Sequence, residues 1–295
     1  MSMSNLKYRK SIIFAFALTI VLWASAFPMI KVALHDFKAI DLATLRLLIG
    51  ALILFTFAVV RKLPLPQVKD IPVILLLGFC GFTVYHTALG IGEYYVSAGV
   101  ASLLVSTTPI FSALLAKVFL KERFSTKAWI GSLIAFIGVG FISLGDHHKL
   151  NVALIGVVLI LLASFGESIY FAFQKYYLDK YGFIPFTIYT IIAGALFMVI
   201  FLPDSVHQIP HANVISIMAV VYLGIFPTVI PYICLAYTIN KVGVSDATIS
   251  LYLTPAIALI LAFILVGEIP TLLALLGGIV ILVGVTLTSL NTESQ

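Results

Sequence analysis

The residue that stands out for its chemistry is an acid, Glu167, near the middle of a long apolar run over 152–174. A charged side chain at the centre of a bilayer costs at least about 2.5 kcal/mol, so such residues face a cavity or a partner. Glu167 is therefore a candidate proton carrier, or a candidate partner for an ammonium group. The alternative is a protonated or paired carboxyl that fixes helix packing.

Two further titratable residues lie inside apolar runs. Lys31 follows Trp23 by eight residues and could meet a substrate carboxylate or pair with Glu93. Alternatively, its ammonium reaches the outer headgroups while its stem lies along apolar surface. His86 could titrate near neutral pH, or could simply hydrogen-bond to a neighbouring helix.

Aromatic and small polar residues accompany these groups. Tyr170 and Gln174 lie three and seven residues after Glu167, so all three share one helix face. An aromatic pocket for an apolar substrate is one interpretation, and helix packing or lipid contact is the other. The other candidates for substrate contact are Trp23, Ser25, Phe27, Tyr85, Ser106, Tyr232 and Tyr252.

Prolines interrupt several of the same runs. Proline cannot donate to the carbonyl four residues earlier, and it kinks a helix. Broken backbone at membrane depth is tolerated where it lines a cavity or is buried in protein. The prolines are hinge or gate candidates, with static kinks as the alternative: Pro28, Pro109, Pro227, Pro231 and Pro255.

The elements that must position these residues are long apolar segments. The chain has 295 residues, of which 62% are apolar and 10% charged, whereas soluble domains have about 25% charged residues. Apolar runs of roughly 18–25 residues recur along the chain, and runs of this length predict an all-α integral membrane protein. We predict ten transmembrane helices over 11–34, 41–60, 71–92, 97–119, 127–144, 152–174, 185–202, 212–236, 244–266 and 271–290.

An internal repeat divides the chain. Ala101–Pro109 and Ala247–Pro255 are similar, and each is followed by one Glu and two Gly at the same spacing. All these positions are separated by 146 residues. The repeat predicts two five-helix halves, 1–145 and 146–295.

The basic residues predict the orientation. If the N-terminus is inside, 13 of the 17 Lys and Arg residues fall on the cytoplasmic side, which also places both termini there. This bias explains the net charge of +5 without a nucleic-acid partner. Because each half has five spans, the second half must be inverted, an arrangement that recurs in secondary transporters.

The chain resembles the drug/metabolite transporter superfamily, in particular the EamA family of ten-helix exporters. The resemblance implies an inverted-repeat transporter, often of amino acids or related metabolites. It also implies a central cavity lined by spans 1, 3, 4, 6, 8 and 9, with spans 5 and 10 at a packing or dimer surface. The matching features are Trp23-Ala24-Ser25-Ala26-Phe27, Lys31, Arg46, Ala88-Leu89, the two Thr-Pro…Glu blocks, and the pairs Gly131/Gly138 and Gly277/Gly284.

We therefore expect a secondary-active exporter of amino acids or similar metabolites in the bacterial inner membrane, working by alternating access. Protons are a candidate coupling ion, and the protein would be a monomer or a homodimer. A broad exporter of drugs or lipid-like compounds is the alternative, and a lipid-modifying enzyme is disfavoured because the polar groups stand singly and at depth. No nucleotide-binding loop, HExxH or Gly-x-Ser-x-Gly motif is present, so we expect no enzyme, cofactor or metal.

Overall fold

The structure is a computed structural model that describes residues 3–119, 126–145, 150–242 and 253–289. Every regular element among these residues is helical. η1, η3 and η4 are 3₁₀ turns and η2 is a π-helix. The elements are, in chain order, α1 (Met3–Ala33), α2 (Ala39–Val60), η1 (Val68–Asp70), α3 (Ile71–Gly78), η2 (Phe79–Val84), α4 (Tyr85–Gly92), α5 (Ala98–Val105), α6 (Thr108–Phe119), α7 (Thr126–Gly145), α8 (Leu150–Phe173), α9 (Lys175–Tyr181), α10 (Phe183–Met198), η3 (Val199–Phe201), α11 (Leu202–Gln208), η4 (Ile209–His211), α12 (Val214–Val242), α14 (Thr254–Val266) and α15 (Leu272–Ser289).

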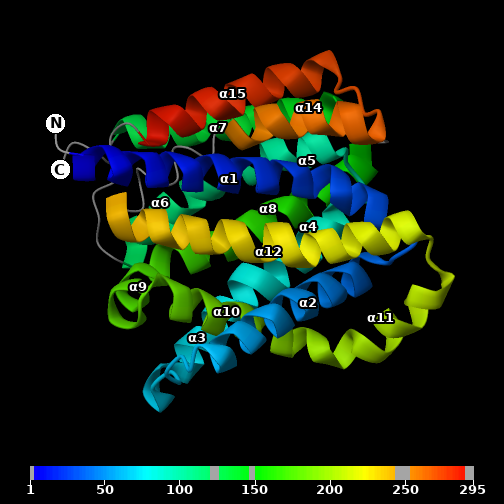
Figure 1. Ribbon diagram of the computed structural model, residues 1–295. Helices are drawn as coiled ribbons and strands as arrows, with labels where there is room; N and C mark the ends of the chain where they lie inside the picture. The colour runs from blue at the N-terminus through cyan, green and yellow to red at the C-terminus, as the bar shows by residue number, and fades with distance from the viewer. Residues whose placement is uncertain (1–2, 120–125, 146–149, 243–252, 290–295) are drawn as a thin grey trace.

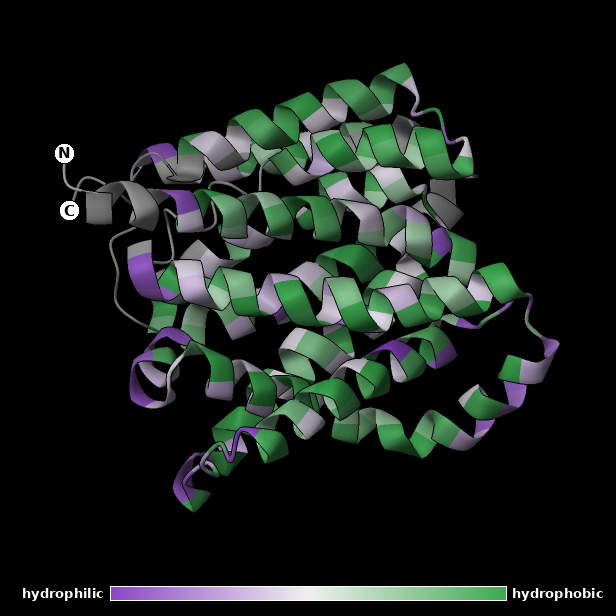
Figure 2. Ribbon diagram, in the orientation of Figure 1, coloured by the Kyte–Doolittle hydropathy of each residue, from purple (hydrophilic) through white to green (hydrophobic). Residues whose placement is uncertain are grey.

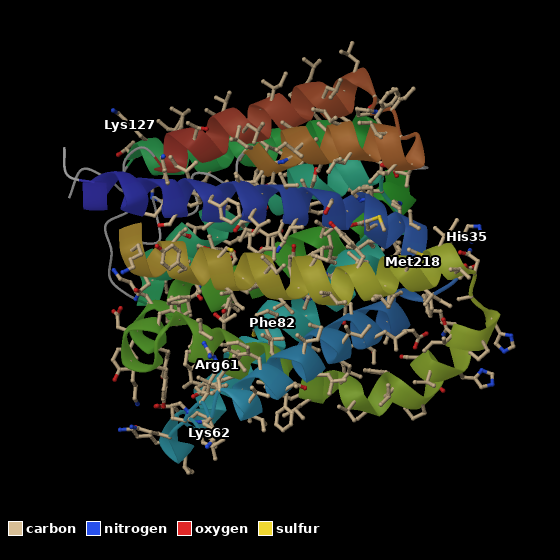
Figure 3. All side chains as sticks on the ribbon, in the orientation of Figure 1. His35, Arg61, Lys62, Phe82, Lys127 and Met218 are labelled. Atoms are coloured by element: carbon tan, nitrogen blue, oxygen red, sulfur yellow. The ribbon has the colours of Figure 1, made fainter. Side chains whose placement is uncertain are left out.

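The long helices form one bundle with their axes roughly aligned (Figure 1). α7 packs along α15 at one edge, α1 packs against α12 in the middle, and α2 packs against α10 and α12. α1 begins and α15 ends at the same end of the bundle, where α9 also lies, and α11 lies towards the opposite end. Lys62 and Lys127 lie at the α9 end, whereas His35 lies at the other (Figure 3).

The outer faces of the bundle are apolar. Hydrophilic residues gather towards the two ends of the helices, and the sides are hydrophobic (Figure 2). Leu52, Leu133 and Ile279 remain 67%, 65% and 59% exposed, and an exposed apolar surface of this extent is suited to lipid. Among the described residues, six helical segments are long and apolar enough to cross a membrane, and four shorter helices are also apolar. The protein is therefore a multi-pass helical membrane protein.

Among the described residues, the predicted spans over 71–92 and 97–119 are interrupted near their middles, and the span over 185–202 changes to the 3₁₀ turn η3 near its end. The run over 71–92 contains η2, whose wider turn is typical of functional positions. The run over 97–119 breaks at Ser106 and Thr107, between α5 and α6, because Pro109 stands at the start of α6. The short helices α9 and α11 occupy stretches that the sequence analysis left between or at the ends of spans. The predicted span over 244–266 is described only from residue 253.

Glycines bring helix backbones into close contact. A Cβ atom added to Gly138 on α7 would lie 2.6 Å from the carbonyl oxygen of Gly277 on α15, and one added to Gly284 would meet that of Gly131. Small residues permit such approaches between membrane helices. The predicted spans 5 and 10 thus pack on each other within one chain.

Polar contacts tie the connections together at both ends of the bundle. At the α9 end, Lys180 and Tyr181 both donate to the carboxylate of Asp70. The hydrogen bond to Asp70 raises the pKa of the Lys180 ammonium. At the opposite end, the backbone and side-chain N–H groups of Asn213 donate to Asp36.

Candidate substrate pocket

A pocket lies inside the bundle and has about 660 Å³ of empty space, part of which is open to its surroundings. Its walls come from α1, α2, α4, α5, α6, α8, α12 and α14, so seven of the predicted spans contribute. The resemblance implied six of these, and the structure adds span 2 through Arg46. Apolar walls with a few polar groups are typical of sites for small molecules.

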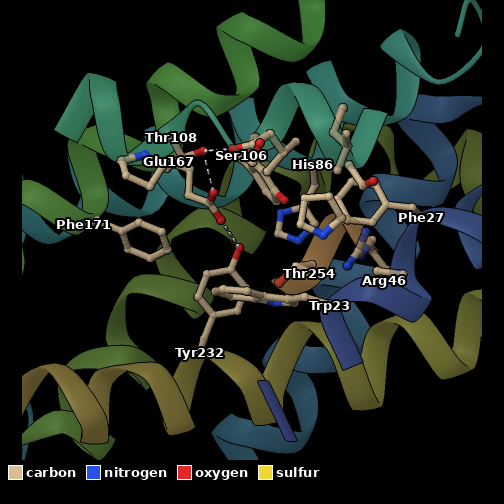
Figure 4. Close-up of a pocket in the computed structure, with 17 residues that line it drawn as sticks. Trp23, Phe27, Arg46, His86, Ser106, Thr108, Glu167, Phe171, Tyr232 and Thr254 are labelled. Carbon is tan, nitrogen blue, oxygen red and sulfur yellow. Dashed lines mark hydrogen bonds between the residues drawn. The ribbon is translucent and has the colours of Figure 1, made fainter. Parts of the chain in front are cut away.

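Glu167 on α8 is the acid of the pocket and is 3% exposed. The Tyr232 hydroxyl donates to its Oε1 at 3.3 Å, and the Thr108 hydroxyl donates to its Oε2 at 3.4 Å (Figure 4). Neither of the ion pairs found in the described part of the chain involves Glu167. Because both bonds are long and come from neutral donors, the carboxyl is available to a proton or to a cationic group.

The break between α5 and α6 places polar groups beside Glu167. Pro109 leaves the carbonyl of Val105 without its usual helical donor, and the Thr108 hydroxyl lies 2.7 Å from that oxygen. The Ser168 hydroxyl, one residue after Glu167, donates to the Thr108 carbonyl at 2.8 Å. These bonds join the broken span to α8 at the depth of the pocket.

The two prolines of α12 free carbonyls that are also satisfied by side chains. Pro227 frees the carbonyl of Leu223, and the Thr228 hydroxyl donates to it at 2.8 Å. Pro231 frees the carbonyl of Pro227 itself, and Nε1 of Trp23 on α1 donates to it at 3.2 Å. The kinked helix is thus bonded to α1 through a residue of the pocket wall.

His86 follows the π-helix and is 2% exposed. Its Nδ1 lies 2.8 Å from the carbonyl oxygen of Phe82, and since a carbonyl only accepts, Nδ1 carries the proton. In the neutral ring Nε2 is then an acceptor. Among the described residues this buried Nε2 has no hydrogen-bond partner, which leaves it free to bind a donor in the pocket.

Arg46 is a pocket residue that the sequence analysis did not count as a site candidate. It lies on α2, is 4% exposed, and donates from Nε to the Thr228 hydroxyl at 3.1 Å. The available signal was an arginine inside an apolar run. The sequence places it within or at the end of the predicted span over 41–60, and since α2 begins at Ala39, Arg46 lies two turns inside the helix.

The other predicted site residues fall into three groups. Trp23, Phe27, Tyr85, His86, Ser106, Glu167, Tyr232, Pro109 and Pro255 line the pocket. Ser25, Lys31, Tyr170, Gln174, Pro28, Pro227 and Pro231 do not. Tyr252 lies outside the described residues.

The residues outside the pocket have identifiable partners or positions. Ser25 hydrogen-bonds to Tyr222 at 2.7 Å, and the Lys31 ammonium donates to the backbone carbonyl of Glu93. Tyr170 is buried against Phe82, with ring centroids 5.1 Å apart. Gln174 is buried at the start of α9.

The repeat's second acid acts as a helix cap. Oε2 of Glu268 accepts a 2.8 Å hydrogen bond from the backbone N–H of Ala98, at the start of α5. This agrees with the cap role expected for an acid at a span end. Its repeat partner, Glu122, lies outside the described residues. No group of residues suited to a metal ion occurs in the described part of the chain.

Comparison with known proteins defines the class. The sequence profile of the EamA-like transporter family matches residues 10–144 and 154–290. The uncharacterized transporter YdfC of Bacillus subtilis is 51% identical over 284 residues, covering 96% of this chain and 92% of the relative. A probable terminal-alkyne amino-acid exporter of Streptantibioticus cattleyicolor is 36% identical over 280 residues, covering 95% of this chain and 94% of the relative.

The fold is also found in a solved structure. A crystal structure superposes with a TM-score of 0.65 at 16% identity, covering 96% of this chain and 97% of the other. A multi-pass helical bundle with an internal pocket and these relatives is a membrane transporter. The chain belongs to the EamA-like transporter family.

Proposed function

We propose that the protein is a secondary-active exporter of amino acids or related small metabolites, and that it works by alternating access. Two halves, residues 1–145 and 146–295, would each supply five of ten spans in inverted orientation. The pocket between them would open to one side of the membrane at a time, as in other inverted-repeat transporters.

The observation that carries this proposal is the pairing of residues around the pocket. Ten of its lining residues form pairs at nearly constant separation along the chain, 144 residues in two pairs and 146 in three. A site on a pseudo-twofold axis is expected to be built in this way. The pairs are Trp23 with Glu167, Phe27 with Phe171, His86 with Tyr232, Thr108 with Thr254, and Pro109 with Pro255.

The α7–α15 contact supports the same symmetry. Gly131 and Gly277 are 146 residues apart, as are Gly138 and Gly284. Gly138 approaches Gly277, and Gly284 approaches Gly131, so each contact becomes the other when repeat partners are exchanged. Reciprocal contacts of this kind are characteristic of a twofold relation.

A second reciprocal contact lies across the bundle. A Cβ on Gly50 of α2 would lie 3.0 Å from the carbonyl oxygen of Gly224 on α12, and a Cβ on Gly194 of α10 would lie 2.7 Å from that of Gly78 on α3. Gly78 and Gly224 are 146 residues apart, and Gly50 and Gly194 are 144 apart. The separations match those of the pocket pairs.

Orientation follows from the basic residues. Lys62 and Lys127 lie at the end of the bundle where α1 begins (Figure 3), and this end would be cytoplasmic by the positive-inside rule. Both termini would then face the cytoplasm, with the protein in the bacterial inner membrane.

The pocket fits a small molecule that carries an amino group. Glu167 offers an unpaired carboxyl, and Trp23, Phe171 and Tyr232 supply aromatic surface around it. Glu167 would bind either a proton or the substrate's ammonium group, which would exchange during the cycle. The relative named as a probable amino-acid exporter supports this substrate class.

One observation favours a second candidate, a broad exporter of lipid-like compounds. An apolar groove with about 1,450 Å³ of empty space, part of which is open to its surroundings, lies beside α8. Leu76, Phe119, Phe165 and Phe173 line it. A hydrophobic substrate could enter the bundle from the bilayer along such a groove.

Transport by purified protein in liposomes tests the proposal. We expect uptake of radiolabelled amino acids that responds to a pH gradient, and loss of that response in Glu167→Gln. Asp204→Asn is the matched control, because Asp204 is exposed on α11 and lines neither the pocket nor the groove. If lipid-like compounds were moved and amino acids were not, the second candidate would replace the first.

A further inference from the structure

The guanidinium of Arg46 is buried without an acidic partner. In the part of the chain that the structure describes, its hydrogen bond from Nε to Thr228 is the one it makes, and no carboxylate forms an ion pair with it. Burying a charge is costly unless it is paired. One hydrogen bond to a neutral hydroxyl does not offset the cost of burying this charge, so a further partner for the guanidinium is expected.

The bond to Thr228 fixes how Arg46 is held. The Thr228 hydroxyl already donates its proton to the Leu223 carbonyl, so it can only accept from Arg46. This anchors Nε against α12 and leaves the four N–H donors of the two terminal nitrogens unused. Arg46 lines the pocket, and a guanidinium matches the planar geometry of a carboxylate.

The placement of charge in the pocket supports a zwitterionic occupant. Arg46 and Glu167 lie on opposite sides of the pocket, with His86 and Trp23 between them (Figure 4). One side thus offers a fixed cation and the other an acid. Lys31 does not compete for an anion in the pocket, because its ammonium donates to the Glu93 backbone carbonyl outside it.

We propose that Arg46 binds the carboxylate of the substrate, so that the pocket selects amino acids over amines or amides of the same shape. The proposal rests on the function proposed above and adds to it the group that recognises the acid. The sequence analysis had assigned that role to Lys31 as one alternative.

The test compares three probes that share one ring: phenylalanine, phenylalaninamide and phenethylamine. Binding is read from thermal stabilisation of the purified protein, because a ligand stabilises only the state that binds it, and transport is read in liposomes. The wild type should prefer phenylalanine by about 10- to 100-fold, the range expected for hydrogen bonds to a charged group. Arg46→Gln should reduce this preference to about threefold or less. Arg46→Lys keeps the charge but lacks the planar guanidinium donors, so its preference should lie between those of the wild type and Arg46→Gln.

Each outcome decides the proposal. Preference for the acid that persists in Arg46→Gln overturns the role of Arg46 while leaving the exporter function in place. A wild type that moves all three probes equally also overturns it. If the wild type moves no amino acid, the exporter function fails and this inference fails with it. Should Arg46→Gln not fold, the wild-type preference together with its partial loss in Arg46→Lys decides the matter.

Discussion

The hydrogen bond between Trp23 and the backbone of α12 gives a sharp prediction about how the kinked helix is held. Nε1 of Trp23 donates at 3.2 Å to the Pro227 carbonyl, which Pro231 deprives of its helical donor. Trp23→Phe removes the donor but keeps a ring beside Tyr232, whose centroid lies 5.1 Å from that of Trp23. The main loss is therefore one hydrogen bond, leaving a buried carbonyl unsatisfied.

The expected cost is about 1 kcal/mol. Leaving a buried acceptor unpaired costs about 1–3 kcal/mol in soluble proteins, and hydrogen bonds between membrane helices average about 0.6 kcal/mol. Because about 1.4 kcal/mol is a factor of ten in an equilibrium constant, Trp23→Phe should shift the unfolding equilibrium about fivefold. Equilibrium unfolding in detergent measures this shift.

A double-mutant cycle isolates the cause. In Pro231→Ala, the new backbone N–H can donate to the Pro227 carbonyl, so the indole N–H becomes redundant. Trp23→Phe should then cost less than about 0.3 kcal/mol, which is the usual error of additivity. An equal cost in both backgrounds would show that Trp23 stabilises the bundle by packing, and the hydrogen-bond account would be refuted.

Three further predictions concern contacts elsewhere in the bundle. Gly138→Leu should destabilise the protein by at least about 1–3 kcal/mol through overpacking against α15. Gly140→Leu should not, because an added Cβ at Gly140 meets nothing within 4 Å. Thermal unfolding compares the two variants, and equal effects would argue against close α7–α15 packing. Glu268→Ala should lower stability by about 1 kcal/mol, because it removes the acceptor of the Ala98 N–H at the start of α5, where Ser97 remains the N-cap. Glu268→Gln, which keeps an acceptor, should recover most of the loss. Thr108→Val should slow transport at least about fivefold, because it removes the hydroxyl that lies beside the Val105 carbonyl and Oε2 of Glu167 and leaves Tyr232 as the donor to that carboxyl. Thr56→Val, whose hydroxyl bonds within an exposed part of α2, is the control.

Several features of the fold could be predicted because they depend on the local sequence alone. Long apolar runs require helices that bury or satisfy every backbone group, so the membrane class and most described helix ends followed from hydropathy. Proline chemistry is equally local: the freed carbonyls near Pro109 and Pro227 follow from the sequence alone. Which side chain would satisfy each carbonyl does not, since Trp23 is 204 residues away from Pro227.

The residues of the candidate site could be predicted better than their arrangement in space. An acid in mid-span marks Glu167 because its solvation cost has to be offset by a cavity or a partner, and the structure places it in the pocket; its role stays a prediction. Arg46 was missed because its position, within the predicted span over 41–60 or at its end, was left open. The π-helix of η2 leaves no clear local signal, so the bond from His86 to Phe82 that orients Nε2 could not be foreseen.

Lys31, Tyr170 and Gln174 show how far the position of a residue on a helix face can predict its contacts. Tyr170 and Gln174 share a helix face with Glu167, yet a face is wider than a pocket. Tyr170 packs against Phe82. Gln174 lies two turns after Glu167, at the start of α9. Lys31 was expected to meet a carboxylate or the headgroups, and it donates instead to a backbone carbonyl.

The most direct test of the central claim is the amount of amino acid that accumulates outside cells producing this protein. Cells with the wild type or with Asp204→Asn should release more of at least one amino acid than cells without the protein. Cells with Glu167→Gln, at equal membrane levels of protein, should release no more than the control cells. Equal accumulation with Glu167→Gln and the wild type would contradict the account.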